Sequence, residues 1–281
     1  MTEFSDRNFT HLPAAASRLG AVFGRPKTLA IGCVIALAAL GWGYLAVLTA
    51  ADYNGVVEVL CQPLSSGVPS TGGIALIAAM WAAMTLAMMI PSAAPMIYTY
   101  AEIADTAARK GERIVSPFVL AGGYTVVWLG FSIVATAAQL LFTRYALLDS
   151  GMASASGLFS GAILLVAGVY QFSALKHACL TLCRNPFPFF FTNWATTAPG
   201  VFRLGVKQGV YCFGCCWAMM AVMFAVGVMN VFWMAALGIL MTVEKTTTGR
   251  RLTQAIGVAL IAAGIAFVVV AFAAHWPPRG I

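Results

Sequence analysis

The apolar run over residues 209–243, GVYCFGCCWAMMAVMFAVGVMNVFWMAALGILMTV, decides how this chain can cross a bilayer. As one helix its about 35 residues would extend roughly 52 Å, whereas the hydrocarbon core of a membrane is about 30 Å thick. Residues 227–230 offer a place to turn. The sequence therefore predicts two short antiparallel spans, of which the second, about 228–243, is short enough to be re-entrant or strongly tilted instead.

The composition indicates a polytopic membrane protein. Hydrophobic residues make up 61% of the 281 residues and charged residues only 9%, with a mean hydropathy of +0.88, whereas a soluble domain has roughly 25% charged residues. We expect an all-α transmembrane helix bundle over residues 28–274, between a cytoplasmic tail (1–27) and a short outside tail (275–281). A net charge of +7 spread over so few charged residues does not indicate a nucleic-acid partner.

Five further apolar runs are long enough to cross the bilayer, namely 28–50, 72–100, 116–142, 157–182 and 252–274. With the two short spans they make about seven. This count leaves Arg144 and Arg279 outside and the other fourteen of the sixteen Lys and Arg inside, which satisfies the positive-inside rule with a cytoplasmic N-terminus. We expect a multi-pass protein of the cell inner membrane, in contact with lipid.

Sulfur is concentrated in the stretch Tyr211–Met223, YCFGCCWAMMAVM. On a helix its thiols and thioethers form a ladder that rises about 16 Å, mostly on one face. The six sulfur residues are Cys212, Cys215, Cys216, Met219, Met220 and Met223. Thiolate and thioether are soft donors, and the combination favours Cu(I), with zinc as the alternative metal.

The predicted topology brings more sulfur to the same depth, near the cytoplasmic face. Cys179 and Cys183 end the fourth span beside His177, and Met84, Met88 and Met89 lie in the second span. These six residues complete the candidate metal site. Methionine also commonly fills gaps in a core, and a lone histidine is more often a hydrogen-bonded interface residue, so packing is the competing interpretation.

The sequence also predicts a bend in the second span, a charged surface pair and a cysteine on the outside. Pro91 and Pro95 should bend the second span and free backbone carbonyls, which neighbouring side chains would then have to meet. Glu244 and Lys245 are adjacent at the end of an apolar run, and we interpret them as an ordinary surface pair. Cys61, in the loop 51–71, is expected outside, as a lone cysteine or a partner-pairing thiol.

The chain resembles the predicted metal-binding integral membrane proteins, a family whose members are often labelled copper chaperones. Four motifs carry the resemblance and cover about residues 72–251: WAAMTLAMMIPSAAP (81–95), YQFSALKHACLTLCR (170–184), GVYCFGCCWAMMAVM (209–223) and EK (244–245). The Cys-x-x-Cys-Cys-Trp run is the most specific of them. The resemblance implies metal binding at these positions.

Three functions compete. A Cu(I)-handling protein would receive copper at the thiols and pass it by ligand exchange to the thioethers, with a copper-donor or copper-acceptor protein as partner; it would not be an enzyme. A thiol-disulfide or quinone oxidoreductase could use Cys212 and Cys215, because a Cys-x-x-Cys pair at a helix N-terminus has reactive thiols. A subunit of a metal-dependent membrane oxygenase is the third alternative, although such centres usually need several histidines. The sequence does not indicate an oligomeric state.

Overall fold

The structure is a computed structural model that describes residues 26–51, 71–112, 114–145, 147, 156–228 and 230–275. In these residues it contains helices and turns and no strand. The helices are α2 (Pro26–Ala51), α4 (Thr71–Arg109), α5 (Pro117–Arg144), α6 (Gly157–Tyr170), α7 (Ala174–Arg184), α8 (Pro186–Thr192), α9 (Ala198–Ala221), α10 (Met223–Val226), α11 (Val231–Thr246) and α12 (Arg251–His275). The all-α prediction is confirmed. Residues 1–25 and 276–281 of the predicted tails, and Cys61, lie outside the described residues, whereas residues 26–27 begin α2 and His275 ends α12.

Five helical segments are long and apolar enough to cross a membrane: those of α2, α4, α5, α12 and the α9–α10 pair. A sixth span results if α6 and α7 count as one, although they meet at an angle of 65°. The span predicted over 157–182 is therefore broken into two helices and is not one continuous helix. Ser173 interrupts it, because its side chain caps a new helix by accepting a hydrogen bond from the backbone N–H of Lys176, at 3.1 Å.

The predicted turn in the long apolar run is confirmed. The chain leaves α10 through Gly227, whose φ of 100° lies in the left-handed region that glycine adopts without strain. Asn230 then caps α11, since its side-chain oxygen accepts a hydrogen bond from the backbone N–H of Trp233, at 3.2 Å. α11 has 16 residues and is shorter than the five candidate spans.

Pro91 frees a backbone carbonyl in α4, as expected, whereas the bend expected from Pro91 and Pro95 stays a prediction. Pro91 has no N–H to give to the carbonyl of Ala87, four residues earlier, and the indole N–H of Trp42 donates to that carbonyl instead, at 2.9 Å. This hydrogen bond joins α2 to α4 at the point where the backbone hydrogen bonds of α4 are interrupted.

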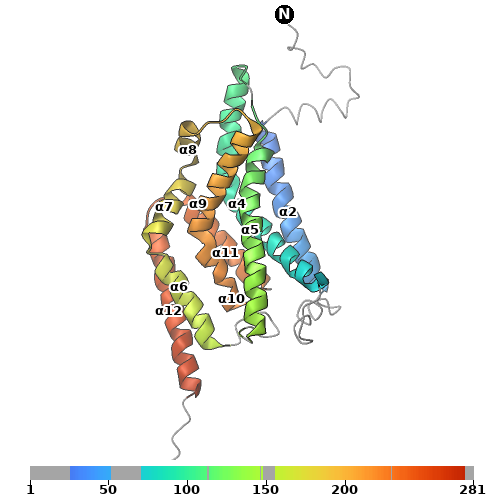
Figure 1. The fold of residues 1–281 in the computed structure, drawn as a ribbon. Coiled ribbons are helices and arrows are strands. Elements are labelled where there is room, and N and C mark those ends of the chain that lie inside the picture. The colour runs from blue at the N-terminus through green and yellow to red at the C-terminus, as the bar shows by residue number, and fades with distance from the viewer. Residues whose placement is uncertain are drawn as a thin grey trace, which may run out of the picture.

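The helices form one bundle, with α4, α5, α9 and α11 at its centre and α6 lying beside α12 at one side (Figure 1). The buried core includes large side chains from α4 and α5, among them Trp81, Tyr100 and Trp128. α9 begins at Ala198, not near Lys207 as the hydropathy suggests, because Thr197 caps it by accepting from the N–H of Gly200, at 3.3 Å. Residues 211–221 of the sulfur-rich stretch therefore lie in the second half of this long central helix, and Met223 begins α10.

Candidate metal centre

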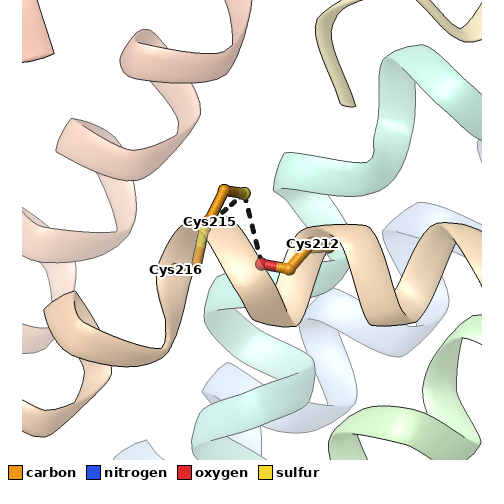
Figure 2. A group of neighbouring side chains, drawn as sticks. All are labelled: Cys212, Cys215 and Cys216. Atoms are coloured by element: carbon orange, nitrogen blue, oxygen red, sulfur yellow. Dashed lines mark hydrogen bonds between the residues drawn. The ribbon is translucent and has the colours of Figure 1, made fainter. Parts of the chain in front are cut away.

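Three thiols of α9 form one compact cluster (Figure 2). The Sγ atoms of Cys212, Cys215 and Cys216 all lie within 4.8 Å of one another, and the Sγ atoms of the last two are 3.4 Å apart. The spacings i, i+3 and i+4 place the three side chains on one helix face, as predicted. All three residues are at most 2% exposed. Such a buried group of thiols could hold a metal ion.

The short helix α7 brings two more cysteines to the same turn of α9. Cys215 contacts Cys183 with 3.8 Å between their Sγ atoms. On the other side of this turn, a Cβ atom placed on Gly214 would lie 2.5 Å from the Sγ of Cys179. Glycine at position 214 thus allows α7 to approach closely, and the break between α6 and α7 is what turns both cysteines toward α9.

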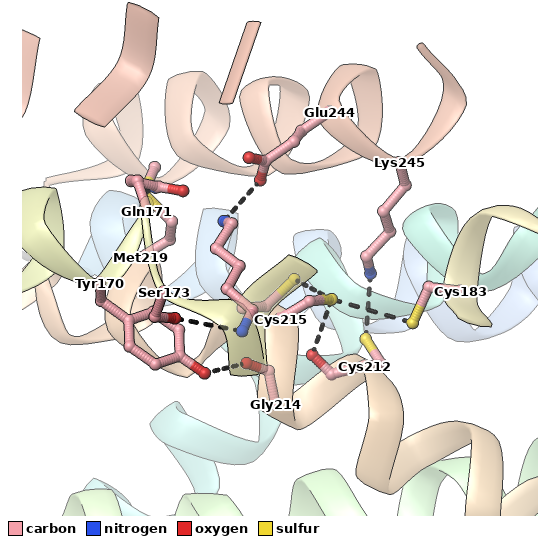
Figure 3. Close-up of polar contacts among 12 residues, drawn as sticks. Tyr170, Gln171, Ser173, Cys183, Cys212, Gly214, Cys215, Met219, Glu244 and Lys245 are labelled. Carbon is pink, nitrogen blue, oxygen red and sulfur yellow. Dashed lines mark hydrogen bonds and ion pairs between the residues drawn. The ribbon is translucent and has the colours of Figure 1, made fainter. Parts of the chain in front are cut away.

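A lysine contacts the first thiol of the cluster (Figure 3). The Nζ atom of Lys245 lies 3.0 Å from the Sγ of Cys212 and donates to the Oγ of Ser92 at 2.7 Å. The hydroxyl of Tyr124 is 2.9 Å from the same Sγ and donates to the backbone carbonyl of Met89 at 3.1 Å. Side chains of α5 and α11 therefore meet at Cys212, and Ser92 of α4 holds the lysine in place. The sequence alone predicted none of these contacts.

The neighbouring glutamate is buried as well. Glu244 pairs with Lys176 of α7 through an Oε2 to Nζ distance of 2.8 Å, and their side chains are 1% and 0% exposed. The guanidinium of Arg184 donates to the backbone carbonyls of Glu244 and Gly249, at 2.8 and 2.9 Å, and so joins the end of α7 to the end of α11. The expectation of a surface pair between Glu244 and Lys245 is wrong, since the two side chains diverge into the core toward different partners.

The predicted methionine ligands are all in the core. Those from α4 are Met84, Met88 and Met89, those from α9 and α10 are Met219, Met220 and Met223, and each is at most 1% exposed. The Sδ of Met219 accepts a hydrogen bond from the amide of Gln171 at 2.9 Å, at the break between α6 and α7. Because burial does not distinguish a ligand from a packing residue, their role in metal binding stays a prediction.

His177 is the remaining predicted ligand. It lies on α7 and is partly exposed. In the described part of the chain, none of the hydrogen bonds of the cysteine cluster goes to it, so its part in a metal site also stays a prediction.

A cavity of about 220 Å³ reaches the cluster. Buried Cys212 and exposed Thr246 both border it, so it connects the first thiol with the surface at the end of α11. Ser92, Tyr124, Arg184, Gln208 and Lys245 also line it.

The position of Cys212 does not favour redox chemistry. A Cys-x-x-Cys pair has reactive thiols when it lies at a helix N-terminus, where the backbone N–H groups favour the thiolate. α9 begins fourteen residues before Cys212, at Ala198, so this thiol lies in the helix interior and this condition is not met.

Comparison with known proteins agrees with the chemistry of the cluster. Residues 78–267 match the family described as PpoB2, a copper chaperone. This match covers more than half of the chain and includes every cysteine of the cluster. Searches of curated proteins and of solved structures gave no match. The chain therefore belongs to the PpoB2 copper chaperone family.

Proposed function

We propose that this protein binds Cu(I) at Cys212, Cys215 and Cys216, and that Cys183 is a fourth sulfur donor available for exchange. The observation that carries the proposal is the convergence of the three buried Sγ atoms within 4.8 Å in a chain of a copper chaperone family. Because Cu(I) binds stably to a small number of soft ligands, two or three thiols are enough to hold it.

The surroundings of the cluster favour Cu(I) over zinc. Structural zinc is usually held by four ligands in a closed tetrahedral site of cysteine and histidine. Here the residues that follow the cysteines along α9 are thioethers, Met219, Met220 and Met223, which suit Cu(I). Zinc remains the metal against which copper should be compared.

Lys245 supports the binding of copper by thiolates in an apolar core. Two thiolates around Cu(I) leave a net charge of −1, and burying an uncompensated charge is costly. The Nζ atom of Lys245, 3.0 Å from the Sγ of Cys212, supplies a positive charge at the place where the negative charge would reside.

We further propose that the protein hands copper on rather than transforming a substrate. Cys179 and Cys183, the thiols of α9, and the methionines of α4, α9 and α10 would serve as successive ligands, with His177 as a secondary one. We place the cysteines toward the cytoplasm, in a seven-span arrangement of the inner membrane with the N-terminus inside. α11 would then have to cross as a short or tilted span. The partners are a copper donor and a copper acceptor.

The test is the metal content and Cu(I) affinity of the purified full-length protein in detergent. We expect bound copper, and the triple variant Cys212→Ser/Cys215→Ser/Cys216→Ser should lose at least about 100-fold in affinity in a competition titration with a Cu(I) chelator, because even changes behind a ligand cost 10- to 100-fold. Cys33→Ser on α2 is the matched control and should bind like the wild type. Equal affinity in the triple variant, a preference for zinc, or turnover of a quinone by the metal-free protein would contradict the proposal.

A further inference from the structure

The cavity beside Cys212 presents hydrogen-bond donors and positive charge. Lys245, Arg184 and Gln208 line it, and among the described residues that line it there is no carboxylate. The nearest glutamate in the sequence, Glu244, is directed away and paired with Lys176 at 2.8 Å. A ligand in this cavity would therefore face two cations and no anion apart from the cluster itself.

Two of the groups that line the cavity, Lys245 and Gln208, have N–H bonds without an acceptor among the described residues. An ammonium group has three N–H bonds, and Lys245 uses two of them, toward Ser92 and Cys212. Gln208 is 2% exposed, and its amide nitrogen is buried without a hydrogen-bond partner in the described part of the chain. Because buried polar groups are normally paired, an acceptor bound in the cavity would satisfy this amide.

The volume of the cavity and its opening limit the size of the ligand that can enter it and decide which thiol that ligand reaches. About 220 Å³ accommodates a small molecule and not a folded partner. Its borders run from exposed Thr246 to buried Cys212, which is the one thiol of the three-cysteine cluster that lines it, and the partly buried thiol of Cys183 lines it too. A ligand carried to this place would meet Cys212 before Cys215 or Cys216.

We propose that the cavity is the loading site for a small anionic Cu(I)–thiolate complex, held by Lys245, Gln208 and Arg184 while its copper passes to Cys212. This inference rests on the proposed copper binding and deepens it by naming the form in which copper arrives. Two thiolates on Cu(I) make an anion, and acceptor groups on the small thiol would match the donors that line the cavity.

The transfer is a ligand exchange without redox change. The bond between Cu(I) and one thiolate sulfur of the small complex breaks as the bond to the Sγ of Cys212 forms, and copper remains Cu(I). The proton that leaves the Cys212 thiol is taken by the departing small thiolate, which is released as the free thiol. Repetition at Cys215 or Cys216 frees the second small thiol.

The experiment measures how fast the metal-free full-length protein in detergent takes Cu(I) from two donors. One donor is the Cu(I) complex of mercaptosuccinate, which is anionic, and the other is the Cu(I) acetonitrile complex, which is cationic. The variant Gln208→Glu has nearly the same shape and adds a negative charge to the cavity. Gln254→Glu adds the same charge on the exposed face of α12 and is the control.

We expect Gln208→Glu to slow loading from the mercaptosuccinate complex by at least about tenfold relative to loading from acetonitrile, because the new carboxylate repels an anion in a partly buried site. The control should leave this ratio of rates unchanged. Gln208→Leu, which removes the donor without adding charge, should lower the ratio by a smaller factor. The ratio is taken within one variant, so a general loss of folded protein does not affect it.

Equal rate ratios in Gln208→Glu, Gln254→Glu and the wild type would overturn the inference. Failure of the proposed function has a different signature, because the wild type would then take up Cu(I) from neither complex.

Discussion

The two sulfur-rich regions of this protein lie in different surroundings. Around the thiols the core contains a buried ion pair, a lysine hydrogen-bonded to Cys212 and a cavity that reaches the surface. Around the methionines it is largely apolar and aromatic; Trp81, for example, packs against Phe224 with 5.1 Å between the ring centroids. Both regions contain soft sulfur atoms, but in the described part of the chain the charged side chains and the cavity lie beside the cysteines. The two regions therefore differ more in what surrounds their sulfur atoms than in the number of those atoms.

The largest effect should come from breaking the ion pair beside the cysteines. Lys176→Met leaves the buried carboxylate of Glu244 without its partner, and we expect a loss of about 3–5 kcal/mol in the free energy of unfolding. Denaturant titration in detergent measures it. Lys207→Met, at an exposed position of α9, is the control and should change stability by less than about 0.5 kcal/mol. Equal effects of the two substitutions would mean that the pair is not buried as described.

Removing the lysine at Cys212 should have the next largest effect. Lys245→Met deletes the positive charge 3.0 Å from the Sγ of Cys212, and we expect Cu(I) affinity to fall by about 10- to 100-fold. A chelator competition measures it, again with Lys207→Met as the control. If Cu(I) affinity is unchanged, Lys245 contributes only to the stability of the fold. The electrostatic difference between the two regions would then have no part in metal binding.

The smallest effect is expected among the methionines. Met84→Leu and Met223→Leu conserve volume, so each should cost less than about 1.5 kcal/mol in stability. Cu(I) affinity should change by less than about tenfold, because the thiols hold the metal first. Chelator competition on each variant tests this, and a loss as large as that of the cysteine variant would make the thioethers primary ligands and remove the distinction between the regions.

Periodicity and hydropathy predicted most of the helices and the cysteine cluster. The turn at Gly227 and the shared face of Cys212, Cys215 and Cys216 are local properties of the chain, set by span length and by helical spacing. The break between α6 and α7 was missed, because apolar residues continue across it and a single serine supplies the cap. The start of α9 was likewise placed too late, since a loop rich in proline and aromatic residues hides where it begins.

The sequence by itself determined the apolar and helical character of this protein and the shared face of its three clustered cysteines, because composition and spacing within one helix are enough for these. Only the tertiary structure decided what surrounds the donors. The contact of Lys245 with Cys212 joins residues from two helices, and the pairing of Glu244 with Lys176 joins a third. Such pairs depend on how helices cross, and a charged side chain at the end of an apolar run has the same local pattern whether it turns to water or into the core.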